Sequence, residues 1–297
     1  MNRYQGFKLV TLMSLRLPRR GLDVAARIIT TVNRILDHGQ REAILANLRV
    51  ILGPTASEKR IRRDMRRTFY SFGKYFAEFL GFERFGGPFI DEHVDVVGEE
   101  HLREALARGK GAILNAAHLS NWELGAATIA RRGYPVLGVA LPHPDPALDE
   151  YVNRQRRSRG YSVIPTEGAY RKCMAALGRN EVVCMVGDRD VGIGGVEVEF
   201  FGRPTVLPQG PIRIALASGA PILPGFVIRR SDDSFAVVLE PPLTVPSSGS
   251  RREKARAMLQ EFANTLERYV RRFPTQWGVF YKYWPDEGEE SVQGADM

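Results

Sequence analysis

The amino-acid sequence predicts an α/β fold with a mixed, largely parallel sheet flanked by helices and preceded by an N-terminal helical, membrane-docking segment. Three observations support this prediction. Apolar residues recur at helical spacing over 5–82, short β-rich runs alternate with helices from residue 94 onward, and an amphipathic helix over 251–272 closes the chain. Alternating strands and helices are typical of a sheet covered by helices.

The first 82 residues read as consecutive helices. Apolar side chains with interspersed basic residues occupy 6–35, a pattern that suits a helix lying on an anionic membrane. A helix packed on its own domain with a solvated basic face remains the alternative. Ser57-Glu58 begins a long helix whose apolar and aromatic side chains recur every three or four residues. We interpret this stripe as core rather than as a ligand tunnel: Ile61, Met65, Phe69, Phe72, Tyr75, Phe76 and Phe79.

The second part of the chain carries the predicted strands. They are expected over 94–97, 111–115, 135–140, 161–164, 181–186, 197–201, 221–228 and 235–240. No internal repeat or low-complexity linker divides the chain, so we expect one domain. Within it, 1–85 is a helical membrane-associating part, 86–285 an α/β core able to hold a catalytic site, and 286–297 an acidic tail.

The composition describes a globular chain of 297 residues, with 44% hydrophobic and 26% charged residues. Its two cysteines, Cys173 and Cys184, provide no disulfide framework, and we expect both to be small core side chains. The five histidines are scattered, so no cluster of His, Cys or carboxylate side chains predicts a metal site.

Positive charge is concentrated in the first quarter of the chain. Residues 1–74 contain sixteen Lys and Arg but five Asp and Glu, whereas the whole chain has a net charge of +8. Such a segment favours an anionic partner: a lipid surface, an acidic carrier protein or nucleic acid. No uncharged stretch in this quarter approaches the roughly 18 residues of a membrane span, and no secretory signal is expected. The sequence therefore favours peripheral attachment.

The strongest chemical signal is a histidine followed, five positions later, by a carboxylate. His118 comes directly after the apolar run 112–114, and Glu123 lies in the following helical pattern. A histidine between a strand and a helix lies where α/β folds bind ligands, and its ordinary pKa near 6.5 suits a general base. Glu123 would orient its ring. Alternatively, Ser120-x-x-Glu123 forms a capping box that only satisfies backbone donors.

Two further groups of charged residues are candidates for substrate binding. Asp188, Arg189 and Asp190 follow the apolar strand 182–186 at a crevice edge, where Arg189 can hold a phosphate or polarise a carbonyl. A surface turn with an internal ion pair is the alternative. Arg156 and Arg157 can bind an anionic head group or a donor phosphate, although solvated helix charge explains them equally well.

The order of several motifs resembles one protein family along nearly the whole chain, roughly 5–285. The first block is Asn115-x-x-His118-x-x-Asn121-Trp122-Glu123. Later blocks are Asn153-Arg-Gln-Arg156-Arg157-Ser-Arg159-Gly160, Gly187-Asp188-Arg189-Asp190, Gly195-Val-Glu197-Val-Glu199-Phe-Phe201-Gly202-Arg-Pro204, Leu207-Pro-Gln-Gly210-Pro211 and Ala220-Pro221-Ile222. The series resembles the bacterial lipid A biosynthesis (lauroyl/myristoyl) acyltransferases of the lysophospholipid acyltransferase superfamily. It is also similar to the phosphatidylinositol mannoside acyltransferases.

This resemblance implies a catalytic His118–Glu123 pair and direct acyl transfer without an acyl-enzyme. It implies an acyl-carrier-protein or coenzyme A thioester as donor and co-substrate, no other cofactor, and a hydroxyl of a membrane glycolipid, such as a lipid A precursor, as acceptor. Glu197 aligns best with a glutamate used for acceptor binding in the mannoside-acylating relatives, and an exposed position on an edge strand is the alternative interpretation. The family also implies a peripheral position on the cytoplasmic face of the inner membrane.

Two other functions need to be separated from acyl transfer. Arg60–Arg67 lie on one helix that can track phosphates, but the neighbouring aromatic residues fall on an apolar face and no groove-reading motif is present, so we expect no nucleic-acid partner. A hydrolase with water as acceptor fits the same residues. A Gly-x-Ser-x-Gly elbow is absent from the sequence, which argues against a serine nucleophile.

Overall fold

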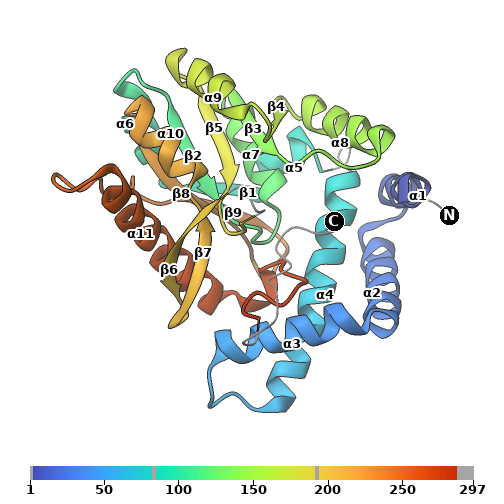
Figure 1. Cartoon of the computed structure of the whole chain (residues 1–297). Coiled ribbons are helices and arrows are strands. Elements are labelled where there is room, and N and C mark those ends of the chain that lie inside the picture. Colours follow the sequence, from blue (N-terminus) through green and yellow to red (C-terminus); the bar gives the residue numbers. More distant parts are fainter. Residues whose placement is uncertain (1–2, 82–84, 191–193, 286–297) are drawn as a thin grey trace.

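A computed structural model describes residues 3–81, 85–190 and 194–285, so the predicted acidic tail 286–297 lies outside the described residues (Figure 1). The helices are α1 (Arg3–Arg16), α2 (Arg19–Leu36), α3 (His38–Leu52), α4 (Glu58–Leu80), α5 (Gly87–His93), α6 (Glu99–Ala107), α7 (Trp122–Arg131), α8 (Pro146–Ser158), α9 (Ala169–Gly178), α10 (Gly210–Ser218) and α11 (Arg251–Arg272). The strands are β1 (Val94–Val97), β2 (Ala112–Ala116), β3 (Val136–Ala140), β4 (Ser162–Pro165), β5 (Val182–Val186), β6 (Gly195–Phe200), β7 (Arg203–Pro208), β8 (Ile222–Arg229) and β9 (Phe235–Leu239).

Seven strands form one mixed sheet in the order β1-β9-β8-β2-β5-β3-β4. The strands from β8 to β4 are parallel, whereas β9 runs antiparallel to β8 and parallel to β1. Helices cover both faces, so the central strands are apolar on both sides. Ile113 packs in one core cluster, whereas its neighbours Ala112 and Leu114 pack in the other. The predicted α/β class with a largely parallel sheet is confirmed.

The pairing of β2 with β5 places the ends of two central strands side by side. Ala116, the last residue of β2, pairs with Val186, the last residue of β5. Two residues beyond these positions stand His118 and Asp188. Because parallel strands end at the same edge of a sheet, the topology alone brings these two side chains together.

One strand and one helix were not predicted. Residues 203–208 form β7, which pairs antiparallel with β6 through a tight turn at Phe201 and Gly202, both with positive φ. Pro204 and Pro208 disfavour a strand, since proline cannot donate to a ladder. They are accommodated because this hairpin has only two strands. The short helix α5 was also missed.

Three helices pack around α4, which forms the axis of the N-terminal part (Figure 1). Helix α2 approaches α4 so closely at Gly73 that a Cβ atom there would lie 2.4 Å from Thr30 Cγ2. Any larger residue at position 73 would therefore have to displace the Thr30 side chain. Within the described ranges, no helix is both long and apolar enough to cross a bilayer.

Candidate active site

His118 is held by a buried carboxylate. Its Nδ1 lies 2.7 Å from Asp188 Oδ1, and its backbone N–H donates to Asp188 Oδ2 over 3.0 Å. The Trp277 indole N–H donates to the same Oδ2 over 2.9 Å, and the Tyr283 hydroxyl donates to the Asp188 carbonyl over 2.6 Å. Asp188 has no exposed surface. It is therefore no surface turn, and its carboxylate fixes the orientation of the imidazole ring.

The electrostatics of this pair suit a neutral base. Burial and the nearby Arg189 guanidinium lower the pKa of His118, against the opposing effect of Asp188. Burial alone would raise the pKa of Asp188, but His118, Arg189 and the Trp277 N–H lower it to about 2. At neutral pH, Asp188 is thus ionised and accepts the Nδ1 proton of an uncharged ring. In that tautomer Nε2 is free to accept a proton.

The loop that carries His118 is fixed by two backbone hydrogen bonds to the segment 276–278. Gly278 N–H donates to the His118 carbonyl and Ser120 N–H donates to the Gln276 carbonyl, both over 2.8 Å. Ser120 adopts a φ of 54°, which is uncommon for a residue with a side chain. Such conformations persist where the surroundings determine them, and they cluster at functional sites.

The capping-box interpretation of Ser120 and Glu123 is wrong. Helix α7 is capped by Asn121, whose side-chain oxygen accepts from Leu124 N–H over 3.0 Å. The Glu123 carboxylate points instead to Arg156 on α8, with a shortest N–O distance of 2.6 Å, and accepts from the Tyr161 hydroxyl. Glu123 has only 5% of its surface exposed, so this ion pair is buried.

The structure places Glu123 and Arg156 together but pairs the His118 ring with Asp188. Burial would raise the pKa of Glu123, yet Arg156 and Tyr161 lower it overall. The negative charge of Glu123 raises the pKa of His118, although its effect follows those of burial, Arg189 and Asp188. Glu123 therefore acts on the base as a nearby charge, while its hydrogen bonds join α7 to α8.

The other candidate binding residues divide into near and distant positions. Arg189 donates to the Gly278 carbonyl and lies over the Tyr281 ring at 5.6 Å, so it belongs to the surroundings of His118. Arg157 is exposed and pairs with Glu150 over 2.5 Å. Glu197 is exposed on β6, next to the buried Val198. Among the described residues, neither Arg157 nor Glu197 forms a hydrogen bond with His118.

Aromatic side chains form a wall beside the base. The Trp122 ring meets His118 edge-on at 4.7 Å and stacks on Tyr75 at 4.3 Å. Tyr75 is buried, whereas Phe72 and Phe76 are half-buried beside it. The predicted aromatic stripe of α4 is therefore core at its ends, Phe69 and Phe79. Between these ends, Tyr75 and its neighbours lie close to the candidate site. Trp277 and Trp122 are neighbours of the base that sequence reasoning did not assign.

The cysteines do not offer a nucleophile. Burial raises the pKa of Cys173 to about 11 and that of Cys184 to about 12. Both thiols remain protonated at neutral pH, and a thiol is a poor nucleophile compared with a thiolate.

The position of Arg189 leads to a testable pH dependence. Replacing Arg189 by Gln removes a positive charge that lowers the pKa of His118, so the pKa should rise. Because the base must be uncharged, activity should be lost at a higher pH on acidification. We expect the acid limb of kcat/KM, measured from pH 5 to 8, to move upward. Arg179→Gln, a surface change at the Glu181 pair, is the control. An unmoved limb would contradict the electrostatic role of Arg189.

Comparison with known proteins agrees with this geometry. The model of the bacterial lipid A biosynthesis acyltransferase family matches residues 3–285. The chain belongs to this family. It is an acyltransferase, and the resemblance found in the motifs is confirmed.

Relatives with two different acceptors are similar to this acyltransferase. It is 29% identical over 282 residues to a phosphatidylinositol mannoside acyltransferase of Mycobacterium tuberculosis, covering 92% of this chain and 84% of the relative. A protein of the same description from Mycolicibacterium smegmatis is 27% identical over 252 residues, covering 83% and 80%. A lipid A biosynthesis lauroyltransferase of Escherichia coli is 29% identical over 198 residues, covering 65% and 63%.

Proposed function

We propose that this acyltransferase moves a fatty acyl chain from a phosphopantetheine thioester, carried by acyl carrier protein or coenzyme A, to a hydroxyl of a membrane glycolipid. The observation that carries the proposal is the His118–Asp188 pair at the carboxyl ends of two central strands. It provides a neutral, oriented base in a family of acyltransferases. Besides the acceptor and this thioester, the proposed chemistry requires no further co-substrate or cofactor.

The proposed reaction is a direct displacement. His118 Nε2 takes the proton of the acceptor hydroxyl while that oxygen attacks the thioester carbonyl carbon, and the C=O electrons move to oxygen. Collapse of the tetrahedral intermediate re-forms the carbonyl and breaks the C–S bond. The thiolate leaves and receives the proton from His118, which returns to its neutral form. Asp188 stabilises the transient imidazolium, and the positive charge of Arg189 favours the oxyanion.

The acceptor is proposed to be a phosphatidylinositol mannoside or a related glycolipid rather than a lipid A precursor. The alignments with the two mannoside acyltransferases span 83% and 92% of the chain, against 65% for the lauroyltransferase. The purified enzyme should be incubated with a phosphatidylinositol mannoside or a lipid A precursor as acceptor, and with acyl carrier protein or coenzyme A thioesters as donor. The acylated products should be identified by mass spectrometry. Release of free fatty acid without an acylated lipid would instead indicate a hydrolase.

We also propose that α2 docks the enzyme on the membrane as a peripheral protein. The contacts of helix α2 with α4 include polar and small side chains: the Tyr70 hydroxyl donates to Asp23 over 3.2 Å, Arg27 lies over the Tyr70 ring at 4.4 Å, and Thr30 and Ala26 lie against Gly73. Apart from the buried Leu22, its large apolar side chains face away from the protein. They are between 48% and 77% exposed and comprise Val24, Ile28, Ile29, Val32, Ile35 and Leu36. A helix of a water-soluble domain normally buries that face.

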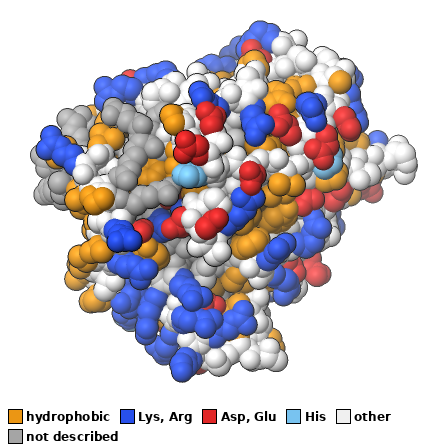
Figure 2. Space-filling model, turned by 180° about the vertical axis from the view of Figure 1, so that it is seen from behind, with side chains coloured by type: hydrophobic (Ala, Val, Ile, Leu, Met, Phe, Trp, Pro, Cys, Tyr) orange, Lys and Arg blue, Asp and Glu red, His pale blue; other side chains and the backbone are white. Residues whose placement is uncertain are grey.

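Exposed basic side chains lie on the neighbouring helix α4. The N-terminal half of α4 exposes a row of six cations: Lys59, Arg60, Arg62, Arg63, Arg66 and Arg67. Figure 2 shows Lys and Arg side chains gathered over the lower part of this face, with hydrophobic side chains at its left edge. An apolar helix flanked by cations is the arrangement that binds anionic lipid surfaces.

Vesicle flotation tests this docking surface. Replacing Ile28 and Ile35 by Glu should abolish flotation with vesicles that contain anionic phospholipid, because both side chains would carry charge into the interface. Binding of the unchanged protein should weaken with added salt. Val245→Glu, an equally exposed apolar position between β9 and α11, is the matched control. Flotation that survives the double change would contradict docking through α2.

A further inference from the structure

A second buried ion pair lies beside the catalytic loop and has no role in the proposed chemistry. Arg229, at the end of β8, donates from both terminal nitrogens to Glu78 on α4, each over 2.6 Å. The two side chains are 10% and 9% exposed. Glu78 also lines a cavity with Phe85, Phe89 and Arg159. Since burying charge costs free energy, such a pair requires an explanation beyond stability alone.

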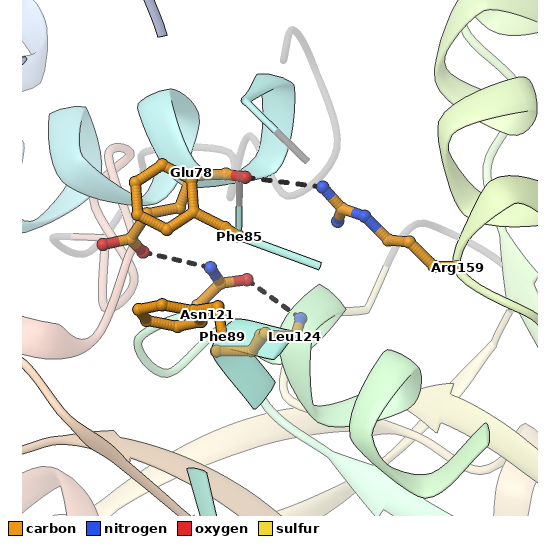
Figure 3. A pocket seen from close by; sticks show the side chains of 6 residues that line it. All are labelled: Glu78, Phe85, Phe89, Asn121, Leu124 and Arg159. Carbon is orange, nitrogen blue, oxygen red and sulfur yellow. Dashed lines mark hydrogen bonds between the residues drawn. The ribbon is translucent and has the colours of Figure 1, made fainter. Parts of the chain in front are cut away.

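Glu78 contacts the loop through Asn121, the residue that caps α7. The Asn121 side-chain N–H donates to Glu78 Oε2 over 3.1 Å, while its oxygen caps the helix through Leu124 N–H. Figure 3 shows Asn121 between these two partners. Asn121 stands three residues after His118, so Glu78 fixes the far end of the segment that carries the base.

Arg229 reaches the same loop by a second route. Its backbone N–H donates to the Gln276 side chain over 2.9 Å, and the Gln276 amide donates back to the Arg229 carbonyl over 2.8 Å. The Gln276 carbonyl in turn accepts from Ser120 N–H over 2.8 Å. The two members of the ion pair are therefore both linked to the loop: the Glu78 side chain bonds Asn121 directly, and the backbone of Arg229 is linked through Gln276 to Ser120.

We propose that Glu78 and Arg229 are positioning residues that hold the 118–121 loop in its reactive geometry. This inference rests on the proposed role of His118 as base. The strained backbone of Ser120, with a φ of 54°, is the feature that such a frame has to maintain. A displacement of about 1 Å at a catalytic group can lower turnover by roughly 100-fold, so the frame is expected to act on kcat.

The decisive variants separate positioning from stability. Breaking only one side of the pair would leave an unpaired buried charge, so we replace both residues, as Glu78→Leu with Arg229→Met. Asn121→Ser is the second variant. Serine and asparagine are equally good helix caps, so α7 is retained. The side-chain N–H that donates to Glu78 is lost, however. The exposed bidentate pair Asp91–Arg131, changed to Leu and Met, is the control.

Two measurements are made on each full-length variant: steady-state kinetics of thiol release with the glycolipid acceptor, and hydrogen exchange of the loop amides. Both test variants should remain folded, lose roughly 100-fold in kcat with KM nearly unchanged, and exchange the His118 and Ser120 amides faster. The control pair should change neither. Wild-type kcat with unchanged loop exchange in Asn121→Ser would overturn the proposal. If the variants exchange the loop amides faster but the wild-type enzyme itself shows no acyl transfer, the proposed reaction is refuted, whereas the positioning role of Glu78 and Arg229 is supported.

Discussion

Asp188→Asn is expected to lower kcat for acyl transfer by about 10,000-fold, the cost of a wrong imidazole tautomer in a comparable triad. Asp188 Oδ2 accepts two hydrogen bonds, from His118 N–H and Trp277 N–H, so an asparagine would place its oxygen there. Its NH2 group would then face His118 Nδ1 at the Oδ1 position. The ring would have to accept at Nδ1 and carry its proton on Nε2, where no base would remain.

A comparison of Asp188→Asn with Glu123→Gln tests which of the two carboxylates orients the His118 ring. Glutamine keeps an oxygen for Arg156 but loses the charge that pairs with it. Since the described hydrogen bonds of Glu123 go to Arg156 and Tyr161, its replacement should leave the tautomer of His118 unchanged. Kinetic assays at saturating donor, with thermal melting as the control for folding, measure the difference. A larger kcat loss in Glu123→Gln than in Asp188→Asn would reverse the two roles.

His118→Ala is expected to lower kcat by about 100- to 10,000-fold, the usual contribution of a general base. The lost group is the only proton acceptor that the proposed displacement uses. Flotation with vesicles should be unchanged, since α2 is remote from the substitution in the chain. His38→Ala, on a side chain of α3 that is 73% exposed, is the control for handling and folding. Retained turnover in His118→Ala would remove the histidine from the mechanism.

Much of the catalytic half of the molecule is predictable because its strands obey simple rules. Buried parallel strands are short apolar runs, and ligands bind where they end, so His118 and the Asp188–Asp190 segment could be assigned to a crevice. Their direct contact could not be assigned. It depends on β2 and β5 being neighbours with Ala116 opposite Val186, although 65 residues that include two further strands lie between β2 and β5 in the sequence.

Local patterns also mislead where tertiary contacts compete with them. Ser120 and Glu123 have the spacing of a capping box, but a long-range ion pair with Arg156 takes the carboxylate and Asn121 takes the cap. Similarly, the apolar periodicity of residues 19–36 defines an amphipathic helix without defining which face turns inward. The contacts of Asp23 and Arg27 with α4, together with the exposure of the apolar side chains, show that most of the apolar face is left outside.

The tight crossing at Gly73 has a geometric consequence for acceptor choice. Gly73 and Glu78 lie five residues apart on one helix, which corresponds to about 7.5 Å along its axis. If α2 lies on a bilayer, helix α4 would fix the distance between the lipid surface and the His118 loop. Hydroxyls would then be selected by how far they stand from the membrane plane. A head group of the wrong length would present its sugar above or below the base, whatever its chemistry.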